Sequence, residues 1–260
     1  MSHSAIPSSQ APPKYPPSIA AALIAMVVAT MFALQNGWLL LLQTLADFTP
    51  YHAISDNTLL VMSVVLTAVC LVWLIVFWQY FRIRKDSVST AQARKLWQSY
   101  LALLPMDGRV FWRCLWVFLL IVFIASLLAN LATTALSPTP SADAAQMMGH
   151  DTPMWLFALM VMVCAPIYEE LICRGLFWRL GEDIFSHFTD NTNHITILTS
   201  LISSGVFSLL HFQYNLIDTG VMFAVALGLC YARVRTGSVF APMLLHSINN
   251  SLVLLLLILD

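Results

Sequence analysis

The chain has 260 residues, of which 59% are hydrophobic and only 10% are charged. A soluble domain typically carries about 25% charged residues, so this composition excludes an ordinary soluble protein and predicts an all-α, polytopic transmembrane helical bundle. The formal net charge of −1 identifies no partner by charge, and no basic arm indicates a nucleic acid.

An amino-terminal tail precedes the first apolar stretch. Residues 1–17 are rich in Pro and Ser and lack a core-forming pattern, which predicts a disordered cytoplasmic tail. The apolar run that follows is about twice the usual length of a signal-peptide core. We therefore expect it to be retained as the first membrane span.

Apolar stretches long enough to cross a bilayer recur through the rest of the chain. A transmembrane helix needs about 20 apolar residues. Seven stretches meet this condition, and a count of six or eight stays open because the short segment around Asp218 barely separates the fifth from the sixth. The predicted spans are 18–45, 57–81, 110–136, 153–178, 195–214, 217–234 and 239–259.

The segment between the second and third spans, 86–108, predicts a helix lying in the membrane interface. Its apolar residues recur at helical spacing beside Arg94 and Lys95, as in an interfacial amphipathic helix. A plain amphipathic connector explains the same pattern. Residues 18–149 then form an amino-terminal set of membrane helices, and residues 150–260 form a second set.

The positive residues predict the orientation of the bundle. With seven spans, all twelve Lys and Arg residues fall on one side of the membrane. By the positive-inside rule, the amino terminus is then cytoplasmic and the carboxyl terminus is outside. The compact chain and its short tail suggest a bacterial cytoplasmic membrane.

Ionisable residues within membrane spans are costly, which makes them candidates for function. The first three predicted spans carry almost none, whereas the later spans carry several polar clusters. These are "YEELICR" with Glu169, Glu170 and Arg174, "FSLLH" with Phe207 and His211, its continuation through Gln213, Tyr214 and Asn215, and "HSINN" with His246, Asn249 and Asn250.

Helical spacing separates the roles of these side chains. Residues four apart share a helix face, so Glu170 and Arg174 are expected to pair. Glu169 points elsewhere and has no local countercharge, which makes it the better candidate for proton transfer. His246 and Asn250 are also four apart, and two such donors side by side can stabilise an oxyanion.

His211 lies on a separate span and could share a water molecule with Glu169. A base, a water-binding partner and an oxyanion site together suffice to hydrolyse an amide without a side-chain nucleophile. At 1.5 Å per residue, the two side chains differ in depth by on the order of 10 Å. Tilt or a cytoplasmic cavity would remove this difference, and we predict that the two groups lie within water-bridging distance.

Other interpretations stay open. Glu169, His211 and His246 offer a carboxylate and two imidazoles, a plausible ligand set for a divalent metal in a metalloprotease. The same groups could relay protons in a transporter or channel. Buried polar residues also hold helices together in non-catalytic scaffolds. The five cysteines show no paired spacing, and neither an HExxH motif nor a Ser-His-Asp arrangement is present.

The order EExxxR, FxxxH and HxxxN resembles the motifs of the CAAX-protease and bacteriocin-processing family, also called the abortive-infection family. This family includes the Ras-converting CAAX endopeptidase. The resemblance covers roughly residues 150–255, where the three motifs occur in order on successive polar segments. Residues 1–149 share only the general membrane character.

The resemblance implies an intramembrane glutamate-type endopeptidase without a cofactor. Glu169 and His211 would activate the hydrolytic water, while His246 and Asn250 would stabilise the oxyanion. The supporting residues would be Glu170, Arg174 and Phe207. The implied partners are membrane lipids and a peptide or protein substrate, lipidated or not, with the oligomeric state open. Some members serve as immunity or scaffold proteins instead.

Overall fold

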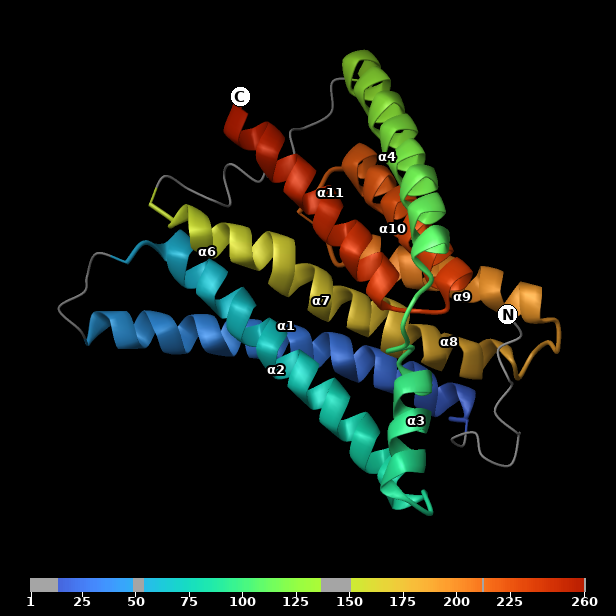
Figure 1. Ribbon diagram of the computed structural model, residues 1–260. Coiled ribbons are helices and arrows are strands. Elements are labelled where there is room, and N and C mark those ends of the chain that lie inside the picture. Colours follow the sequence, from blue (N-terminus) through green and yellow to red (C-terminus); the bar gives the residue numbers. More distant parts are fainter. Residues whose placement is uncertain (1–13, 49–53, 137–150, 212, 260) are drawn as a thin grey trace.

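The computed structural model describes residues 14–48, 54–136, 151–211 and 213–259. All secondary structure in these ranges is helical (Figure 1). One continuous helix runs from Met154 to Phe185 and contains two π-helical stretches. The elements are α1 (Pro17–Asp47), α2 (Asp56–Lys85), α3 (Thr90–Tyr100), α4 (Gly108–Leu136), α6 (Met154–Leu159), the π-helix η2 (Met160–Cys164), α7 (Ala165–Glu170), the π-helix η3 (Leu171–Phe177), α8 (Trp178–Phe185), α9 (Thr192–Leu209), α10 (Leu216–Thr236) and α11 (Phe240–Leu259).

Six helices in the described ranges are long and apolar enough to cross a membrane: α1, α2, α4, the continuous helix α6–α8, α10 and α11. This confirms the all-α polytopic bundle, at the lower end of the predicted range. The stretch predicted as the fifth span, 195–214, differs. It forms α9, which begins on the polar residues Thr192, Asn193 and His194 and ends at Leu209. His211 therefore lies in the turn beyond α9, and Asp218 lies in the first turn of α10.

Local sequence signals explain where several helices begin and end. The side chains of Ser55, Ser89, Asn191 and Asn215 each accept a hydrogen bond from a backbone N–H in the first turn of the helix that follows. Such caps satisfy donors that a helix start leaves open. Gly237 adopts a left-handed φ of 67° and ends α10, a conformation that glycine reaches without a steric penalty.

The helices pack in an order that brings the carboxyl-terminal half around the long helix. In Figure 1, α11 lies across the α6–α7 region, and α10 lies beside α4. α1 packs against α2 and α8. α10 and α4 approach each other closely at Gly228 on α10, where an added Cβ would lie 2.9 Å from Cδ2 of Phe118 on α4. Glycine at this position lets the two helices pack tightly.

Replacing Gly228 by alanine should therefore destabilise the bundle. An extra methyl group in a well-packed contact typically costs about 1–3 kcal/mol. Gly220, on the same helix, is the matched control because an added Cβ there meets nothing within 4 Å. Thermal unfolding of the purified protein in detergent should show a lower midpoint for Gly228→Ala than for Gly220→Ala. Equal midpoints would contradict the close α4–α10 contact.

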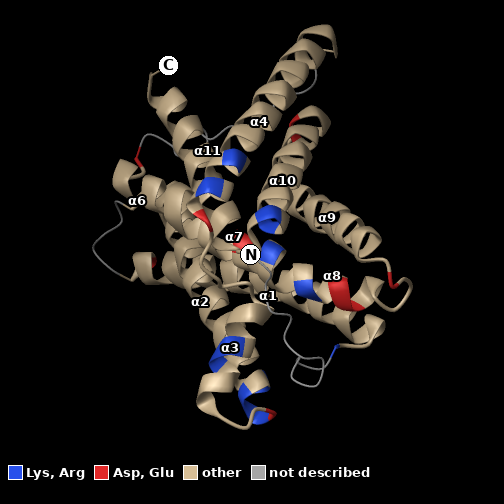
Figure 2. Cartoon of the chain, turned by 45° about the vertical axis from the view of Figure 1, so that its right-hand side comes forward, with Lys and Arg blue, Asp and Glu red and all other residues tan. Residues whose placement is uncertain are grey.

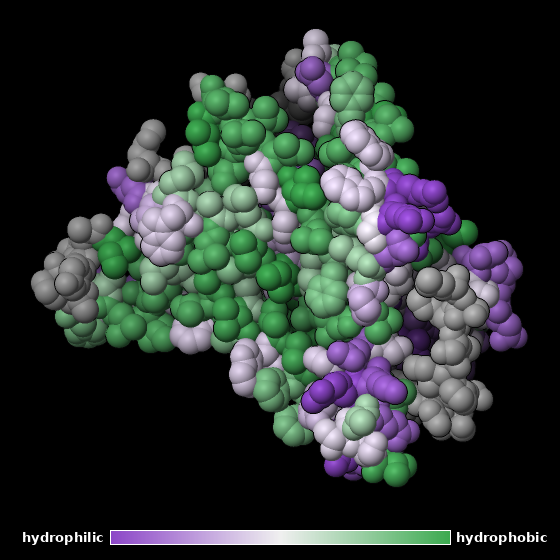
Figure 3. Space-filling view, in the orientation of Figure 1, coloured by the Kyte–Doolittle hydropathy of each residue, from purple (hydrophilic) through white to green (hydrophobic). Residues whose placement is uncertain are grey.

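The basic residues gather at one end of the bundle. All twelve Lys and Arg residues lie in the described ranges, and Figure 2 shows them around α3, α8 and the adjoining helix ends, while the outer parts of α4, α6 and α11 carry none. Figure 3 shows a largely hydrophobic surface over α1, α2 and α6 and hydrophilic residues near α3. The protein is thus an integral membrane protein with a one-sided basic end, as predicted.

The basic end also holds the residues that precede α1. Lys14 Nζ donates to Ser186 Oγ at 3.0 Å, and the backbone N–H of Tyr15 donates to Asp183 Oδ2 at 3.2 Å. The guanidinium of Arg82 lies 4.4 Å from the centre of the Tyr15 ring. The last residues of the predicted tail therefore contact α2 and α8, whereas residues 1–13 lie outside the described ranges.

Candidate active site

The continuous helix Met154–Phe185 carries the two glutamates between two π-helical stretches. η2 ends at Cys164, α7 supplies Glu169 and Glu170, and η3 begins at Leu171. A π turn inserts one residue into the α-helical repeat and is found frequently at functional sites. The local backbone around the glutamates is thus irregular on both sides.

Glu170 and Arg174 form a fully buried ion pair. Arg174 Nη1 lies 3.0 Å from Glu170 Oε1, and both side chains have 0% exposure. Arg174 Nη2 donates to the backbone oxygen of Ala226 at 2.9 Å. The guanidinium also lies 4.7 Å from the centre of the Phe207 ring. These contacts compensate part of the desolvation of the guanidinium, whose Nε has no hydrogen-bond partner among the described residues.

His246 joins the same carboxylate from α11. Its Nδ1 lies 2.9 Å from Glu170 Oε1, the oxygen that also accepts from Arg174. Because an ionised carboxylate only accepts hydrogen bonds, Nδ1 carries the proton. Its Nε2 then faces Glu169, 3.9 Å from Oε2. Glu170 therefore holds both the arginine and the imidazole.

Glu169 differs from Glu170 in its surroundings. Its side chain is 17% exposed, and it lines a cavity of about 530 Å³ that opens among α1, α2, α7, α10 and α11. Its Oε2 is buried and has no hydrogen-bond partner in the described part of the chain. A carboxylate oxygen of this kind can accept a proton or a hydrogen bond from a bound molecule.

His211 reaches the same cavity from the turn after α9. Its Nδ1 lies 2.8 Å from the backbone oxygen of Phe207. Because a carbonyl oxygen only accepts, Nδ1 is the donor, and Nε2 of the neutral ring is left as an acceptor. His211 thus lies in a turn and not in a straight span, and it lines the same cavity as Glu169. A water bridge from His211 to Glu169 stays a prediction.

Asn250 also lines the cavity, one turn after His246 on α11. Its Nδ2 donates to the backbone oxygen of Val161 at 2.8 Å. Its Oδ1 accepts from Asn249 Nδ2 at 3.4 Å. One N–H of the Asn250 amide is thus engaged, and the second N–H is the one that could donate a hydrogen bond to an oxyanion. The four side chains with predicted catalytic roles all line one cavity.

The comparison with protein families agrees with this arrangement. Residues 151–252 match the family model described as type II CAAX prenyl endopeptidase, Rce1-like. This part of the chain is therefore similar to that family. The match contains the EExxxR, FxxxH and HxxxN motifs, so it confirms the resemblance and supports a membrane protease. No curated protein and no solved structure gives a significant match.

Phe207 packs against three of the motif side chains. Its ring centroid lies 4.9 Å from that of His211 and 5.7 Å from that of His246. The Arg174 guanidinium lies 4.7 Å from the same ring centre. The phenylalanine of the FxxxH motif therefore spaces the two imidazoles and covers the buried arginine.

The first span contributes to the cavity, which the sequence interpretation missed. Gln35 and Asn36 on α1 line it, and the signal was present as a polar pair inside the apolar run 18–45. Tyr214, from the polar cluster after His211, also lines it. Burial, followed by the charges of Glu169 and Asp218, raises the pKa of Tyr214. Its hydroxyl therefore stays neutral and can donate.

The cavity combines this polar end with apolar walls. The wall residues come from α1, α2, α6, η2, α10 and α11, which lie far apart in the sequence. They include Met31, Phe32, Val64, Phe157, Met160, Met222, Val253, Leu254 and Leu257. Apolar walls with a few polar groups are typical of ligand sites.

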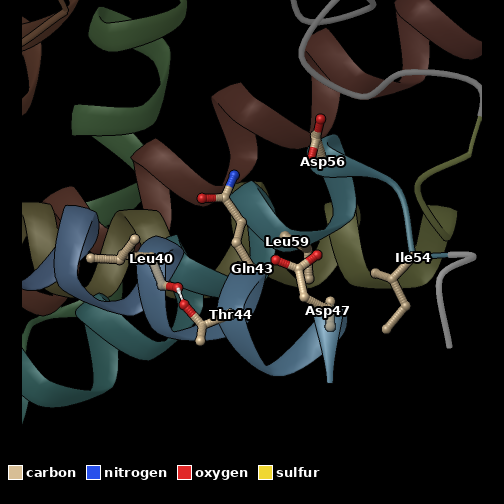
Figure 4. Close-up of a pocket in the computed structure, with 8 residues that line it drawn as sticks. Leu40, Gln43, Thr44, Asp47, Ile54, Asp56 and Leu59 are labelled. Carbon is tan, nitrogen blue, oxygen red and sulfur yellow. Dashed lines mark hydrogen bonds between the residues drawn. The ribbon is translucent and has the colours of Figure 1, made fainter. Parts of the chain in front are cut away.

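A second hollow, of about 470 Å³, lies at the far ends of α1 and α2. Figure 4 shows Gln43, Asp47, Asp56 and Leu59 around it. It contains no residue of the three motifs. The Rce1-like motifs and the larger cavity coincide, and the candidate site is therefore the larger cavity.

The predicted metal alternative requires Glu169, His211 and His246 to converge. Within the residues that the structure describes, no group of three or more His, Cys, Asp or Glu side chains is arranged to hold a metal ion. Nδ1 of His246 is bonded to Glu170, so only Nε2 of this ring could act as a ligand. Metal dependence is a question for chelation, described below.

Proposed function

We propose that the protein is an intramembrane endopeptidase that hydrolyses a peptide bond in a membrane-associated protein or peptide. The observation that carries this proposal is the convergence of Glu169, His211, His246 and Asn250 on one cavity. The Rce1-like match, which contains all four residues, gives independent support. No side-chain nucleophile is needed, because a bound water supplies the attacking oxygen.

The first step forms the carbon–oxygen bond. A water between Glu169 and His211 gives a proton to the free carboxylate oxygen of Glu169, while Nε2 of His211 accepts a hydrogen bond from the same water. The water oxygen then attacks the scissile carbonyl carbon. General-base assistance of this kind typically contributes 10²–10⁴-fold to the rate. The product of this step is a tetrahedral oxyanion.

The oxyanion requires donors aimed at it, and these typically lower the barrier by a few kcal/mol. The second N–H of Asn250 is one donor. His246 supplies another when Nε2 carries a proton, and the Glu170 carboxylate at Nδ1 stabilises that imidazolium. Collapse of the intermediate breaks the carbon–nitrogen bond, and Glu169 returns its proton to the departing amine.

The surroundings suggest the substrate and the orientation. The apolar walls favour a hydrophobic peptide segment that approaches with membrane lipids around it. A basic cytoplasmic end would place the amino terminus in the cytoplasm of a bacterial cell. A carboxyl terminus outside then requires α9 to carry the chain across the membrane as well, because the six long helices alone would return it to the cytoplasmic side. Parallel assays with lipidated and unlipidated peptides of the same sequence would show whether the substrate carries a lipid.

The proposal is tested by incubating the purified protein in nanodiscs with apolar reporter peptides and identifying the products by mass spectrometry. We expect cleavage at one defined bond, and we expect this activity to persist after exhaustive treatment of the protein with a chelator. Loss of cleavage on chelation, with recovery on adding zinc, would instead favour the metal-dependent alternative. Absence of cleavage over a broad peptide set, with normal biological function of a Glu169→Gln variant, would favour a scaffold.

A further inference from the structure

The two π-helical stretches leave backbone carbonyl groups of the long helix without their usual α-helical partners. In an α-helix each carbonyl accepts from the N–H four residues later, and a π turn interrupts this ladder. In a membrane, an unsatisfied backbone group costs several kcal/mol. The Cys173 carbonyl of η3 keeps a π-helical bond from the Trp178 N–H, whereas the Val161 carbonyl of η2 faces Pro166 five residues later, which has no N–H to donate. Carbonyl groups near the glutamates can therefore accept from additional donors.

Side chains from three other helices supply these donors. On the η2 side, Asn250 from α11 donates to the Val161 carbonyl at 2.8 Å. On the η3 side, Ser203 Oγ from α9 donates to the Cys173 carbonyl at 3.0 Å. Nε of Arg233, from α10, donates to the Arg174 carbonyl at 3.0 Å. Asn250 belongs to a family motif, whereas Ser203 and Arg233 do not.

We infer that Ser203 and Arg233 are positioning residues of the site, an inference that rests on the proposed function. Their hydrogen bonds hold the backbone of η3 against α9 and α10. Arg174 lies four residues after Glu170, a spacing that an α-helix also brings to one face. What these two hydrogen bonds fix is therefore the position of the pair relative to α10, where Arg174 Nη2 donates to the Ala226 carbonyl at 2.9 Å.

A shift of η3 changes the position of the His246 imidazole through one oxygen atom of Glu170. Glu170 Oε1 accepts from both Arg174 and His246, so a displaced Arg174 changes the hydrogen bond that fixes Nδ1 of His246. The orientation of Nε2 towards Glu169 depends on that bond. Ser203 thus acts on His246 through η3, Arg174 and Glu170, without touching the cavity itself.

Ser208 provides a matched control on the same helix. Ser203 and Ser208 are both serines of α9, and they are 2% and 3% exposed. Ser208 Oγ, however, donates to the Ser204 carbonyl of its own helix at 2.8 Å. Removing either hydroxyl therefore costs one buried hydrogen bond, but only the Ser203 variant removes a hydrogen bond between α9 and η3.

The first experiment records the ¹⁵N resonances of histidine in the full-length protein in nanodiscs, with His246 assigned from a His246→Gln variant. We expect Ser203→Ala to move the Nδ1 and Nε2 resonances of His246, and Arg233→Gln to move the same pair. Ser208→Ala should leave them in place. Unchanged resonances in Ser203→Ala, or equal changes in the two serine variants, would overturn the inference.

The second experiment measures cleavage of a reporter peptide. A small misplacement of reacting groups can cost on the order of 10–100-fold, so kcat of Ser203→Ala should fall by that factor with KM nearly unchanged. Ser208→Ala should retain the wild-type kcat, and a loss equal to that of Ser203→Ala would contradict the inference. The histidine resonances are measured without any cleavage, so they test the inference even in an inactive protein. Wild-type protein that cleaves no peptide would therefore refute the proposed function alone.

Discussion

Glu169→Gln is expected to lower kcat for peptide cleavage by about 10²–10⁴-fold while the protein remains folded. The substitution keeps the shape of the side chain and removes its capacity to accept a proton, which is worth that factor for a general base. The fold should tolerate it because Glu169 Oε2 makes no hydrogen bond among the described residues. Steady-state kinetics with a reporter peptide, together with a thermal unfolding midpoint, measure both effects.

The matched control for this prediction is Glu182→Gln. Glu182 lies on the same continuous helix and makes a partly exposed ion pair with Arg179 at 3.0 Å, outside the cavity. The same chemical change there should leave kcat at its wild-type value. Full activity of Glu169→Gln beside loss of activity in Glu170→Gln would reverse the roles assigned to the two glutamates.

The spans were predictable because bilayer thickness sets helix length. The predicted spans 57–81, 110–136 and 239–259 correspond to α2, α4 and α11 within a few residues. The prediction for 195–214 failed at its carboxyl end, where the helix stops at Leu209. The mean apolar character of this stretch concealed a turn, and the Asn215 cap that restarts the helix is a local signal that hydropathy does not capture.

Helical spacing predicted part of the site for an equally local reason. Glu170 and Arg174 are four residues apart, so their pairing follows from the geometry of one helix. The bond from His246 to Glu170 spans 76 residues and depends on how α11 packs, which spacing cannot give. The π-helical stretches have no periodic signature in the sequence, so the bond from Ser203 to the Cys173 carbonyl could not be foreseen.

The second large effect concerns the buried ion pair. Arg174→Met should destabilise the protein by about 3–5 kcal/mol, because it leaves the Glu170 carboxylate buried without its cation. Glu170 has 0% exposure, so water cannot replace the guanidinium. Unfolding in detergent, followed by circular dichroism, measures the loss. Arg179→Met is the comparison, with a smaller expected loss. Its pair with Glu182 is partly exposed, exposed pairs contribute about 0–1 kcal/mol, and its contact with the buried Asp183 is longer, at 3.8 Å.

The double variant Glu170→Gln/Arg174→Met separates the charge from the packing. If the cost of Arg174→Met comes from the stranded carboxylate, neutralising Glu170 in the same protein should recover most of the lost stability. It should not recover cleavage, because Nδ1 of His246 would then face a neutral amide that cannot stabilise an imidazolium. A double variant that is as unstable as Arg174→Met would show that the guanidinium acts mainly through Ala226 and Phe207. Recovered stability without recovered cleavage would mean that the fold does not require the Glu170–Arg174 ion pair. The role of the pair would then be to orient and charge His246.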